Sequence, residues 1–122
     1  MGLFTTAQPD LKRWRLIESL SDLTNAIELS EEYPVLLFKH STRCSISSMA
    51  FSTFNREWQL SEEQCPIYYI DLLKHRDVSN EVAFLTGVIH QSPQAILLKG
   101  GAVIYSASHG AIDAENVENL VL

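Results

Sequence analysis

The stretch VLLFKHSTRCSIS, Val35–Ser47, carries a strand, a polar loop and the first turn of a helix. Its first half is nearly all apolar, as in a central strand whose two faces are both covered. A single cysteine, Cys44, follows the loop, and Ser47 stands where a second cysteine would complete a C-x-x-C pair. The stretch therefore predicts a buried strand that leads into a helix, with one thiol at the helix start.

On both sides of this stretch, the spacing of apolar residues predicts strands that alternate with helices. The expected strands are 14–18, 35–39, 66–73, 94–99 and 102–108, and the expected helices are 19–33, 45–62, 75–88 and 112–122. Gly100-Gly101, between the last two strands, is a strong turn signal for a hairpin. The order β-α-β-α-β-α-β-β-α predicts an α/β fold, with a central mixed sheet and helices on both of its faces. A length of 122 residues favours a single domain, 1–122.

Helical spacing predicts which side chains face the core and where the helices begin and end. Across helix 45–62 we expect an apolar stripe of Ile46, Met49, Ala50, Phe54 and Trp58. Helix 75–88 is expected to end at Gly87 and to turn inward Val78, Val82, Phe84 and Leu85. The expected caps of the first and last helices are Ser21 and Asp113.

Composition and charge argue against several classes of protein. The formal net charge is -6 with acids spread along the chain, whereas nonspecific nucleic-acid binding needs a basic face. No apolar run approaches the ~20 residues of a membrane-spanning helix, and the first residues lack the apolar core of a signal peptide. Two cysteines without a C-x-x-C pair indicate reduced thiols and no structural metal site. We therefore expect a cytoplasmic protein that binds neither nucleic acid nor membrane.

Cys44 is placed where a cysteine becomes reactive. It follows the carboxyl end of a buried strand, which is the edge at which α/β sheets bind ligands, and it precedes a helix. The N–H groups and dipole at a helix N-terminus stabilise a thiolate, and Arg43 adds a positive charge nearby. The hydroxyl of Ser47, one turn on, is expected to donate a hydrogen bond to that thiolate. The competing interpretation is a small core cysteine, which the polar neighbours of Cys44 argue against.

Cys65 is expected to be a structural thiol, buried or half-buried, rather than a partner for Cys44. It lies just before the third strand, and adjacent parallel strands put their starts and ends at opposite edges of the sheet. A strand of about six residues spans roughly 20 Å, whereas a disulfide needs Cα atoms within about 7 Å. A mixed disulfide formed on Cys44 therefore has no internal thiol to resolve it.

Pro93 lies in one of three sequence segments that together resemble a known family. The order of elements places the loop at Pro93 opposite the loop at Cys44, which resembles the cis-proline loop of the thioredoxin fold. The segments STRCSIS, HQSPQ and SASHGAI together resemble the YtxJ-type monothiol bacilliredoxins, which carry a T-C-P-I-S site, an H-x-S-P-Q loop and an A-S-H-x-x-I segment. The resemblance spans almost the whole chain and implies a thioredoxin-like fold.

At the cysteine, the resemblance implies that Cys44 and Ser47 are catalytic. We also expect Thr42, Arg43 and Ser45, around the thiol, to bind substrate, although Arg43 departs from the family motif in the position before the cysteine. The family usually has proline at the position of Ser45. Proline at the first helical position is preorganised for a helix start, and serine there is more flexible. This departure bears on which substrate the thiol prefers and less on which residue is the nucleophile.

At the proline, the resemblance implies a cis peptide bond between Ser92 and Pro93. Such a turn presents the Ser92 backbone for pairing with an extended substrate segment. His90 and His109 also match family positions and are candidates for a supporting role. The alternative for both histidines is an ordinary place on the surface or in a structural hydrogen bond.

The resemblance also implies a reaction, namely removal of bacillithiol from S-thiolated client proteins through a mixed disulfide on Cys44. Bacillithiol, or a similar low-molecular-weight thiol, is then a cosubstrate, and no cofactor is bound. One alternative is a non-catalytic thioredoxin-like module that binds peptides or proteins through the Pro93 loop. A weaker alternative is an iron–sulfur carrier like the monothiol glutaredoxins, against which the absence of a C-G-F-S sequence counts.

Overall fold

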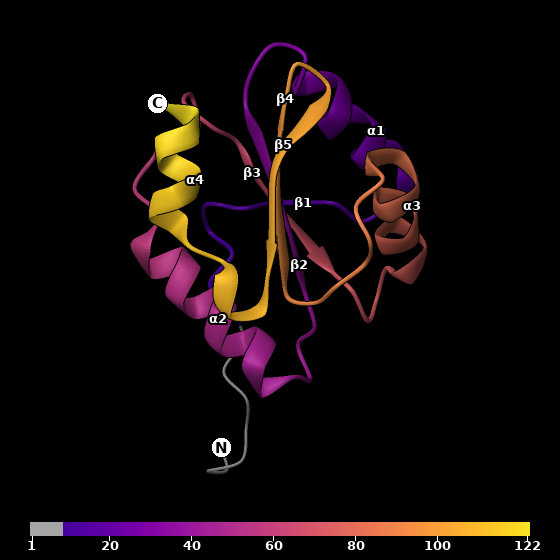
Figure 1. The fold of residues 1–122 in the computed structure, drawn as a ribbon. Helices are drawn as coiled ribbons and strands as arrows, with labels where there is room; N and C mark the ends of the chain where they lie inside the picture. The colour runs from indigo at the N-terminus through magenta and orange to yellow at the C-terminus, as the bar shows by residue number, and fades with distance from the viewer. Residues whose placement is uncertain (1–8) are drawn as a thin grey trace.

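A five-stranded mixed sheet forms the centre of the fold in the computed structural model, which describes residues 9–122 (Figure 1). Its strands, in the spatial order β1-β3-β2-β4-β5, are β1 (Arg15–Leu16), β2 (Val35–His40), β3 (Ile67–Asp71), β4 (Gln94–Lys99) and β5 (Ala102–Ser108). β1, β3 and β2 run parallel, β4 is antiparallel to β2, and β5 is antiparallel to β4. The predicted mixed sheet with a hairpin at one edge is confirmed.

Helices cover both faces of this sheet, as predicted (Figure 1). They are α1 (Leu20–Leu29), α2 (Ser45–Glu57), α3 (Arg76–Thr86) and α4 (Ala114–Val121), and a short 3-10 helix, η1 (His109–Ala111), follows β5. α1 and α3 lie together on one face, and α2 and α4 lie on the other. Across residues 9–122, every helix is too short or too polar to cross a membrane. The prediction that the first residues lack a signal peptide concerns a stretch whose residues 1–8 lie outside the described part of the chain.

The near-continuous apolar run of β2 supplies both halves of the core. Because successive side chains of a strand point to opposite faces, Leu36 and Phe38 pack toward α2 and α4, and Val35 and Leu37 pack toward α1 and α3. All four side chains are fully buried. The same alternation sends the two polar side chains at the end of β2 to opposite faces of the sheet.

The inward face of α2 differs from the predicted stripe. Ile46 and Met49 are 62% and 69% exposed, whereas Ser47, Phe51 and Phe54 face the sheet and are buried. Both sets of residues have helical spacing, so the way in which α2 lies on the sheet decides which set is covered. The expectation that Ile46 and Met49 belong to the core is wrong, and both present apolar surface in the first turns of α2. Phe54 and Trp58, from the same predicted stripe, are buried as expected.

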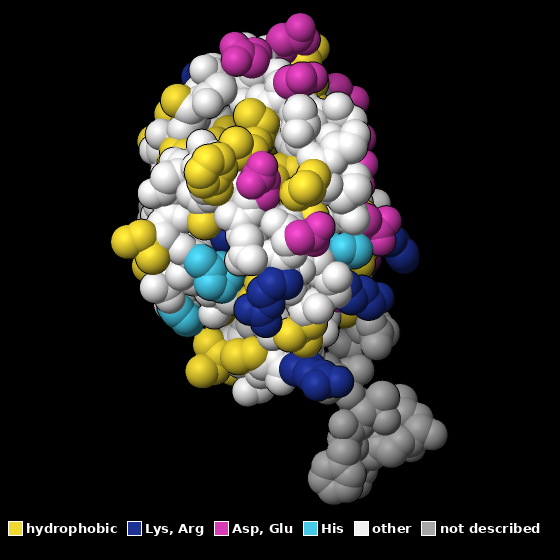
Figure 2. All heavy atoms as spheres, turned by 90° about the vertical axis from the view of Figure 1, so that its right-hand side faces the viewer, with side chains coloured by type: hydrophobic (Ala, Val, Ile, Leu, Met, Phe, Trp, Pro, Cys, Tyr) yellow, Lys and Arg dark blue, Asp and Glu magenta, His cyan; other side chains and the backbone are white. Residues whose placement is uncertain are grey.

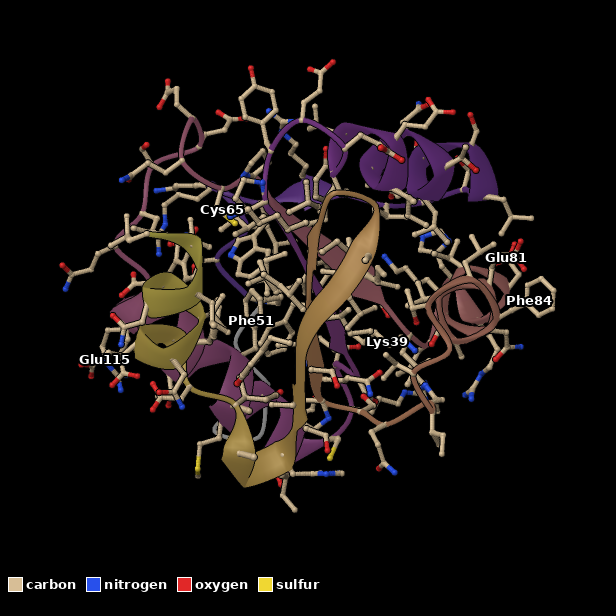
Figure 3. All side chains as sticks on the ribbon, turned by 45° about the horizontal axis from the view of Figure 1, so that its top comes forward. Lys39, Phe51, Cys65, Glu81, Phe84 and Glu115 are labelled. Atoms are coloured by element: carbon tan, nitrogen blue, oxygen red, sulfur yellow. The ribbon has the colours of Figure 1, made fainter. Side chains whose placement is uncertain are left out.

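The outer face of α3 also carries apolar side chains that the sequence assigned to the core. Phe84 is 80% and Leu85 is 49% exposed, and Phe84 points away from the sheet (Figure 3). The buried residues of α3 are Val78, Ser79 and Val82. Phe84 follows Val82 by two residues and therefore falls on the opposite side of the helix. The predicted inward position of Phe84 is wrong for this reason. That of Leu85 is also wrong, although its spacing from Val78 places it near the covered side, where it is only half-covered.

One predicted helix cap is confirmed and the other is displaced by two residues. Ser19, not Ser21, caps α1, because its hydroxyl accepts a hydrogen bond of 3.0 Å from the Asp22 N–H. Ser21 lies within the first turn of α1. Asp113 caps α4 as predicted, and its carboxylate accepts a 2.9 Å hydrogen bond from the Glu115 N–H. Both serines precede the first buried residue of α1, so residue type alone did not separate them.

Glycine is required at the end of α3 and in the hairpin turn. Gly87 ends α3 with φ of 73°, the left-handed conformation of a helix C-cap. Gly100 and Gly101 join β4 to β5 with φ of 62° and 76°, as a tight hairpin turn needs. The Gly100 N–H also donates a 2.7 Å hydrogen bond to the Ser30 carbonyl, which ties the turn to the end of α1. The predicted helix end and hairpin are both confirmed.

Candidate active site

Cys44 stands between β2 and α2, as predicted, and is the N-cap residue of α2. Its carbonyl accepts a 2.9 Å hydrogen bond from the Ser48 N–H, and its own N–H donates to the Ser41 carbonyl at 3.1 Å. The side chain is half-buried and carries a free thiol. A thiol at this position lies beside the first turn of α2, whose N–H groups and dipole favour negative charge.

The loop that ends at Pro93 reaches the same edge of the sheet as the Cys44 loop. β2 ends and β4 begins at this edge, because the two strands are antiparallel neighbours. The Ser92–Pro93 peptide bond is cis. The Pro93 carbonyl accepts a 3.1 Å hydrogen bond from the His109 N–H, which holds the start of η1 against this loop. The fold thus gathers three segments that are far apart in the sequence.

The hydroxyl of Ser47 turns toward the end of β2. Ser47 is fully buried, and its Oγ accepts a 3.0 Å hydrogen bond from the Ser41 N–H and lies 2.6 Å from Nδ1 of His40. Within the described residues, the thiol of Cys44 is not among its hydrogen-bond partners. The expected hydrogen bond from Ser47 to the Cys44 thiolate is therefore replaced by a contact with His40. This contact joins α2 to the end of β2.

His40 is a buried, uncharged ring at neutral pH. It is 2% exposed and stacks on Phe51, with ring centroids 5.3 Å apart. Burial lowers the pKa of His40 to about 4, although the nearby charge of Asp71 acts in the opposite direction. The ring therefore supplies no positive charge to the site at neutral pH and serves to position Ser47.

A second buried polar group, Lys39, lies on the other face of the sheet, toward α3 (Figure 3). Its ammonium nitrogen lies 3.2 Å from the Ser79 carbonyl oxygen and 3.2 Å from Nδ1 of His90. Burial lowers the pKa of Lys39 to about 8. Burial, and then the charge of Lys39, also lowers the pKa of His90. His90 thus anchors the segment that leads to Pro93 onto β2 and α3.

The other predicted substrate contacts lie around the thiol and the proline. Arg43 and Ser45 flank the thiol and are exposed, whereas Thr42 is half-buried. Ser92 is half-buried, and its Oγ has no hydrogen-bond partner among the described residues. His109 is exposed, with φ of 52°. These residues share one edge of the sheet, and their contact with substrate stays a prediction.

Sequence reasoning missed the contact of His40 with Ser47 and that of Lys39 with His90. The available signal was a lysine and a histidine at the end of an otherwise apolar strand. Burying a charged or polar side chain costs free energy unless it has hydrogen-bond partners. Lys39 and His40 are therefore expected to bind polar groups of neighbouring segments. The partners lie up to 51 residues away in the sequence, where local patterns do not reach.

Cys65 lies at the opposite edge of the sheet from Cys44. It precedes β3, whose residue Ile67 pairs with Leu36 near the start of β2, whereas Cys44 follows the end of β2. Cys65 is 1% exposed and free, and burial raises the pKa of its thiol to about 12. The prediction of a buried structural thiol remote from Cys44 is confirmed.

Comparison with known proteins identifies the group to which this site belongs. A family model described as monothiol bacilliredoxin BrxC matches residues 15–117, which include both Cys44 and Pro93. The chain belongs to the monothiol bacilliredoxin family. This bacilliredoxin is accordingly a thioredoxin-like thiol oxidoreductase, and its partners are thiol-bearing molecules in general.

Solved structures show the same fold as this bacilliredoxin. One described as having a thioredoxin fold is 30% identical with a TM-score of 0.74, over 88% of this chain and 92% of its own. A thioredoxin of Malassezia sympodialis is 15% identical with a TM-score of 0.68, over 97% and 95% of the two chains. A mutant thioredoxin of Halobacterium salinarum is 15% identical with a TM-score of 0.66, over 96% and 93%. The predicted thioredoxin-like fold is confirmed.

Proposed function

We propose that this bacilliredoxin removes bacillithiol, or a similar low-molecular-weight thiol, from mixed disulfides on client proteins in a reducing cytoplasm. The observation that carries the proposal is the unequal placement of the two thiols. Cys44 is accessible at the start of α2, whereas Cys65 is buried at the opposite edge of the sheet. A site with one accessible thiol must use a second, external thiol to complete a disulfide exchange.

The first step transfers the small thiol to Cys44. The Cys44 thiolate attacks the small-thiol sulfur of the mixed disulfide, so a Cys44–small-thiol bond forms and the bond to the client cysteine breaks. The client leaves as a thiolate and takes a proton from water. The helix N-terminus stabilises the attacking thiolate, and the exposed Arg43 adds a favourable charge.

The second step regenerates the enzyme. A second small-thiol thiolate attacks the sulfur of the first one on Cys44, which forms a small-molecule disulfide and returns the Cys44 thiolate. Over the whole cycle one free small-thiol molecule is consumed, the client cysteine is released as a thiol, and the disulfide bond ends up between two small-thiol molecules. No bound cofactor or metal takes part in either step.

The surface around Cys44 suits a protein client. The exposed side chains of Ile46 and Met49 offer apolar contact beside the thiol. We propose that the Ser92 backbone at the cis-proline loop pairs with an extended segment of the client, while Thr42 and Ser45 contact its side chains. Ser47 then acts as a positioning residue through His40 and not as a donor to the reacting sulfur.

The test is the release of a small thiol from a client. A peptide that carries a bacillithiol mixed disulfide is incubated with the protein and free bacillithiol, and the free peptide thiol is followed by mass spectrometry. Cys44→Ser is expected to abolish release, whereas Cys65→Ala is expected to retain it. Full activity of Cys44→Ser would overturn the assignment. Binding of the peptide without any exchange in the unmodified protein would favour the non-catalytic binding module.

A further inference from the structure

The loop that leads from α3 to β4, residues 87–93, lies over side chains of the two central strands. Lys39, near the end of β2, and Gln94, the first residue of β4, stand directly opposite each other in the pairing of these strands. Side chains at directly opposite positions of an antiparallel pair point to the same face of the sheet. Here that face is the one covered by α3, and Lys39 lies between the sheet and this helix (Figure 3). Both side chains are therefore directed toward the loop that follows α3.

Each of these two side chains binds one residue of the loop. Nζ of Lys39 lies 3.2 Å from Nδ1 of His90, and Nε2 of Gln94 donates a 3.0 Å hydrogen bond to the carbonyl of Ile89. Lys39 is fully buried and Gln94 is 3% exposed, so both groups need partners inside the protein. Two consecutive residues of the loop are thus fixed to two strands that pair with each other. We call these four residues the loop clamp.

The ammonium group of Lys39 has only uncharged acceptors. Its other contact is the Ser79 carbonyl oxygen, at 3.2 Å, and the ion pairs found within residues 9–122 do not include Lys39. A buried cation without a carboxylate partner costs free energy, which an apolar side chain of similar length would avoid. Lysine is therefore not the residue that stability alone favours at this position, and its contact with His90 points to a role in the loop.

The clamp bears on the segment that is proposed to contact the client. Ser92 lies two residues after His90, and its hydroxyl has no hydrogen-bond partner among residues 9–122. The loop is thus held before Ser92 by the clamp and after it by the pairing of β4 with β2. Because Cys44 follows the end of the same strand β2, one strand relates the Ser92 backbone to the thiol.

We propose that Lys39 is a positioning residue for client binding, that it acts through His90 to hold the Ser92 backbone in place, and that protonation of His90 in acid releases this hold. The inference rests on the proposed function and adds the regulation of its client contact. An ammonium group has donors only, so Nδ1 of His90 is the acceptor in their contact and the ring carries its proton on Nε2. A second proton on the ring would occupy Nδ1, remove the acceptor and place two positive charges side by side.

Solvent protons have access to the ring of His90, which is exposed. On the face that carries α3, histidine side chains reach the surface among Lys and Arg side chains, in the half nearer the start of α2 (Figure 2). Burial, and then the charges of Lys39 from β2 and Arg76 from α3, lowers the pKa of His90 below its ordinary value of about 6.5. The other groups beside the loop, Gln94 and the Ser79 hydroxyl at 3.4 Å from Nδ1, do not titrate in this range. The clamp is therefore closed at neutral pH and opens in acid.

The rate test compares a peptide disulfide with a small disulfide on a Cys65→Ala background. A ten-residue Ala/Ser peptide whose single cysteine is capped by 2-mercaptoethanol, and 2-hydroxyethyl disulfide, are each mixed with the reduced protein. Both reactions leave the same 2-mercaptoethanol disulfide on Cys44, whose formation is timed by intact-protein mass spectrometry. The readout is the ratio of the peptide rate constant to the small-disulfide rate constant.

Lys39→Met and His90→Ala should each lower this ratio about fivefold at pH 7.5, and the double variant should lower it no further, because all three lack the same contact. His90→Ala changes an exposed side chain and therefore tests the contact without a substitution in the core. A merely structural role would lower both rate constants together and leave the ratio unchanged. Val82→Ala, which removes core contacts beneath α3, is the matched control for that effect and should leave the ratio unchanged.

The pH profile of the same ratio tests the release in acid. Because both reactions use the Cys44 thiolate, its own titration cancels in the ratio. The ratio for the unmodified protein should fall about fivefold from pH 7.5 to 5, whereas that for His90→Asn should start at the same value and stay level. Asparagine offers Oδ1 close to the place of the histidine Nδ1 and does not titrate, so it keeps the acceptor and removes the release. Equal pH profiles of the two proteins would overturn the release.

A binding test separates the clamp from the exchange chemistry. The same peptide with its cysteine S-methylated, which cannot exchange, is titrated into Cys44→Ser and followed by the amide chemical shifts of residues 88–92. Shifts that are lost when Lys39→Met is added would support the proposal. Shifts that persist there, or no shift of this loop at all, would overturn it. A protein that binds this peptide in a Lys39-dependent manner but exchanges with neither disulfide would keep the clamp and sink the proposed function.

Discussion

The hydroxyl oxygen of Ser47 lies 2.6 Å from Nδ1 of His40, inside the core and next to the loop that carries Cys44. The same oxygen accepts the Ser41 N–H at 3.0 Å. His40 is the last residue of β2 and Ser47 lies in the first turn of α2. Their contact therefore links the two elements that flank the Cys44 loop. A pair of buried polar groups therefore holds the ends of the loop that carries Cys44.

Ser47→Ala should destabilise the protein and disturb the Cys44 loop. The substitution leaves the Ser41 N–H and the imidazole of His40 without their common partner, and an unsatisfied buried polar group costs about 1–3 kcal/mol. Urea unfolding should show a loss in this range, with a slower exchange at Cys44. Ser45→Ala, at an exposed position one residue after the thiol, is the matched stability control. Equal stability of the two variants would show that the His40 contact contributes nothing.

The burial of His40 should weaken the fold in acid. Its pKa is lowered to about 4, below the ordinary value of about 6.5, so the unfolded chain binds the proton between these pH values and the folded chain does not. The free energy of unfolding should therefore fall as the pH is lowered from 6.5 to 4. Relative to His40→Phe, which cannot titrate, we expect an additional loss of about 3 kcal/mol. Parallel pH profiles of the two proteins would contradict the neutral, buried ring.

Lys39 should give a pH dependence of the same sign at the alkaline end. Its pKa is lowered to about 8, so between pH 8 and about 10.5 the unfolded chain binds a proton that the folded chain has lost. The free energy of unfolding should rise over this range by about 3 kcal/mol relative to Lys39→Met. The measurement is urea unfolding from pH 7.5 to 10.5. A wild-type profile that follows that of the variant would place Lys39 in contact with solvent.

Cys65 should be unreactive until the protein unfolds. With a pKa of about 12, its thiolate fraction at pH 8 is about one in ten thousand, and its sulfur is also covered. Iodoacetamide should therefore label Cys44 in the native protein and label both cysteines in guanidinium. Peptide mapping after timed alkylation distinguishes the two sites. Rapid native labelling of Cys65 would contradict its place in the core.

Ser45→Pro should stabilise α2 without repacking. Ser45 is the first residue of α2 and is exposed, and Cys44 before it has φ of -101° and ψ of 120°, an extended conformation that accepts a following proline. Proline at such a site reduces the entropy of the unfolded chain and stabilises by about 0.4–1 kcal/mol. The thermal midpoint should rise, and the exchange rate of the variant shows what this departure from the family pattern does to Cys44. A lower midpoint would mean that the Ser45 N–H or side chain has a partner in solution.

Much of the fold was predictable because its signals are local. The apolar run of β2 predicts a strand covered on both faces, and Gly100-Gly101 supplies the two left-handed positions that a tight hairpin requires. The place of Cys44 between a strand and a helix was also predictable, because it does not depend on which side chains those elements bury. The remote, buried place of Cys65 also follows from element order, because parallel strands start at the same edge.

Tertiary structure decided which of two equivalent helix faces is covered. Ile46 and Met49 have the same periodicity as Phe51 and Phe54, and the sheet covers the second set. Apolar side chains occur on more than one side of α2, so helical spacing alone leaves open which of them face the core. The surface against which the helix packs decides this. Exposure of the first set leaves apolar surface beside the thiol.

Tertiary structure also decided the partners of the polar residues at the site. Ser47, by sequence, is one turn from Cys44, yet its hydroxyl contacts His40, and Lys39 contacts His90, 51 residues further along the chain. The sequence by itself determined the strand–loop–helix unit and the place of Cys44 within it, since both depend on neighbours in the chain. The hydrogen-bond partners of buried polar side chains depend on how the elements pack, and segments such as that of His90 reach β2 only in the folded sheet.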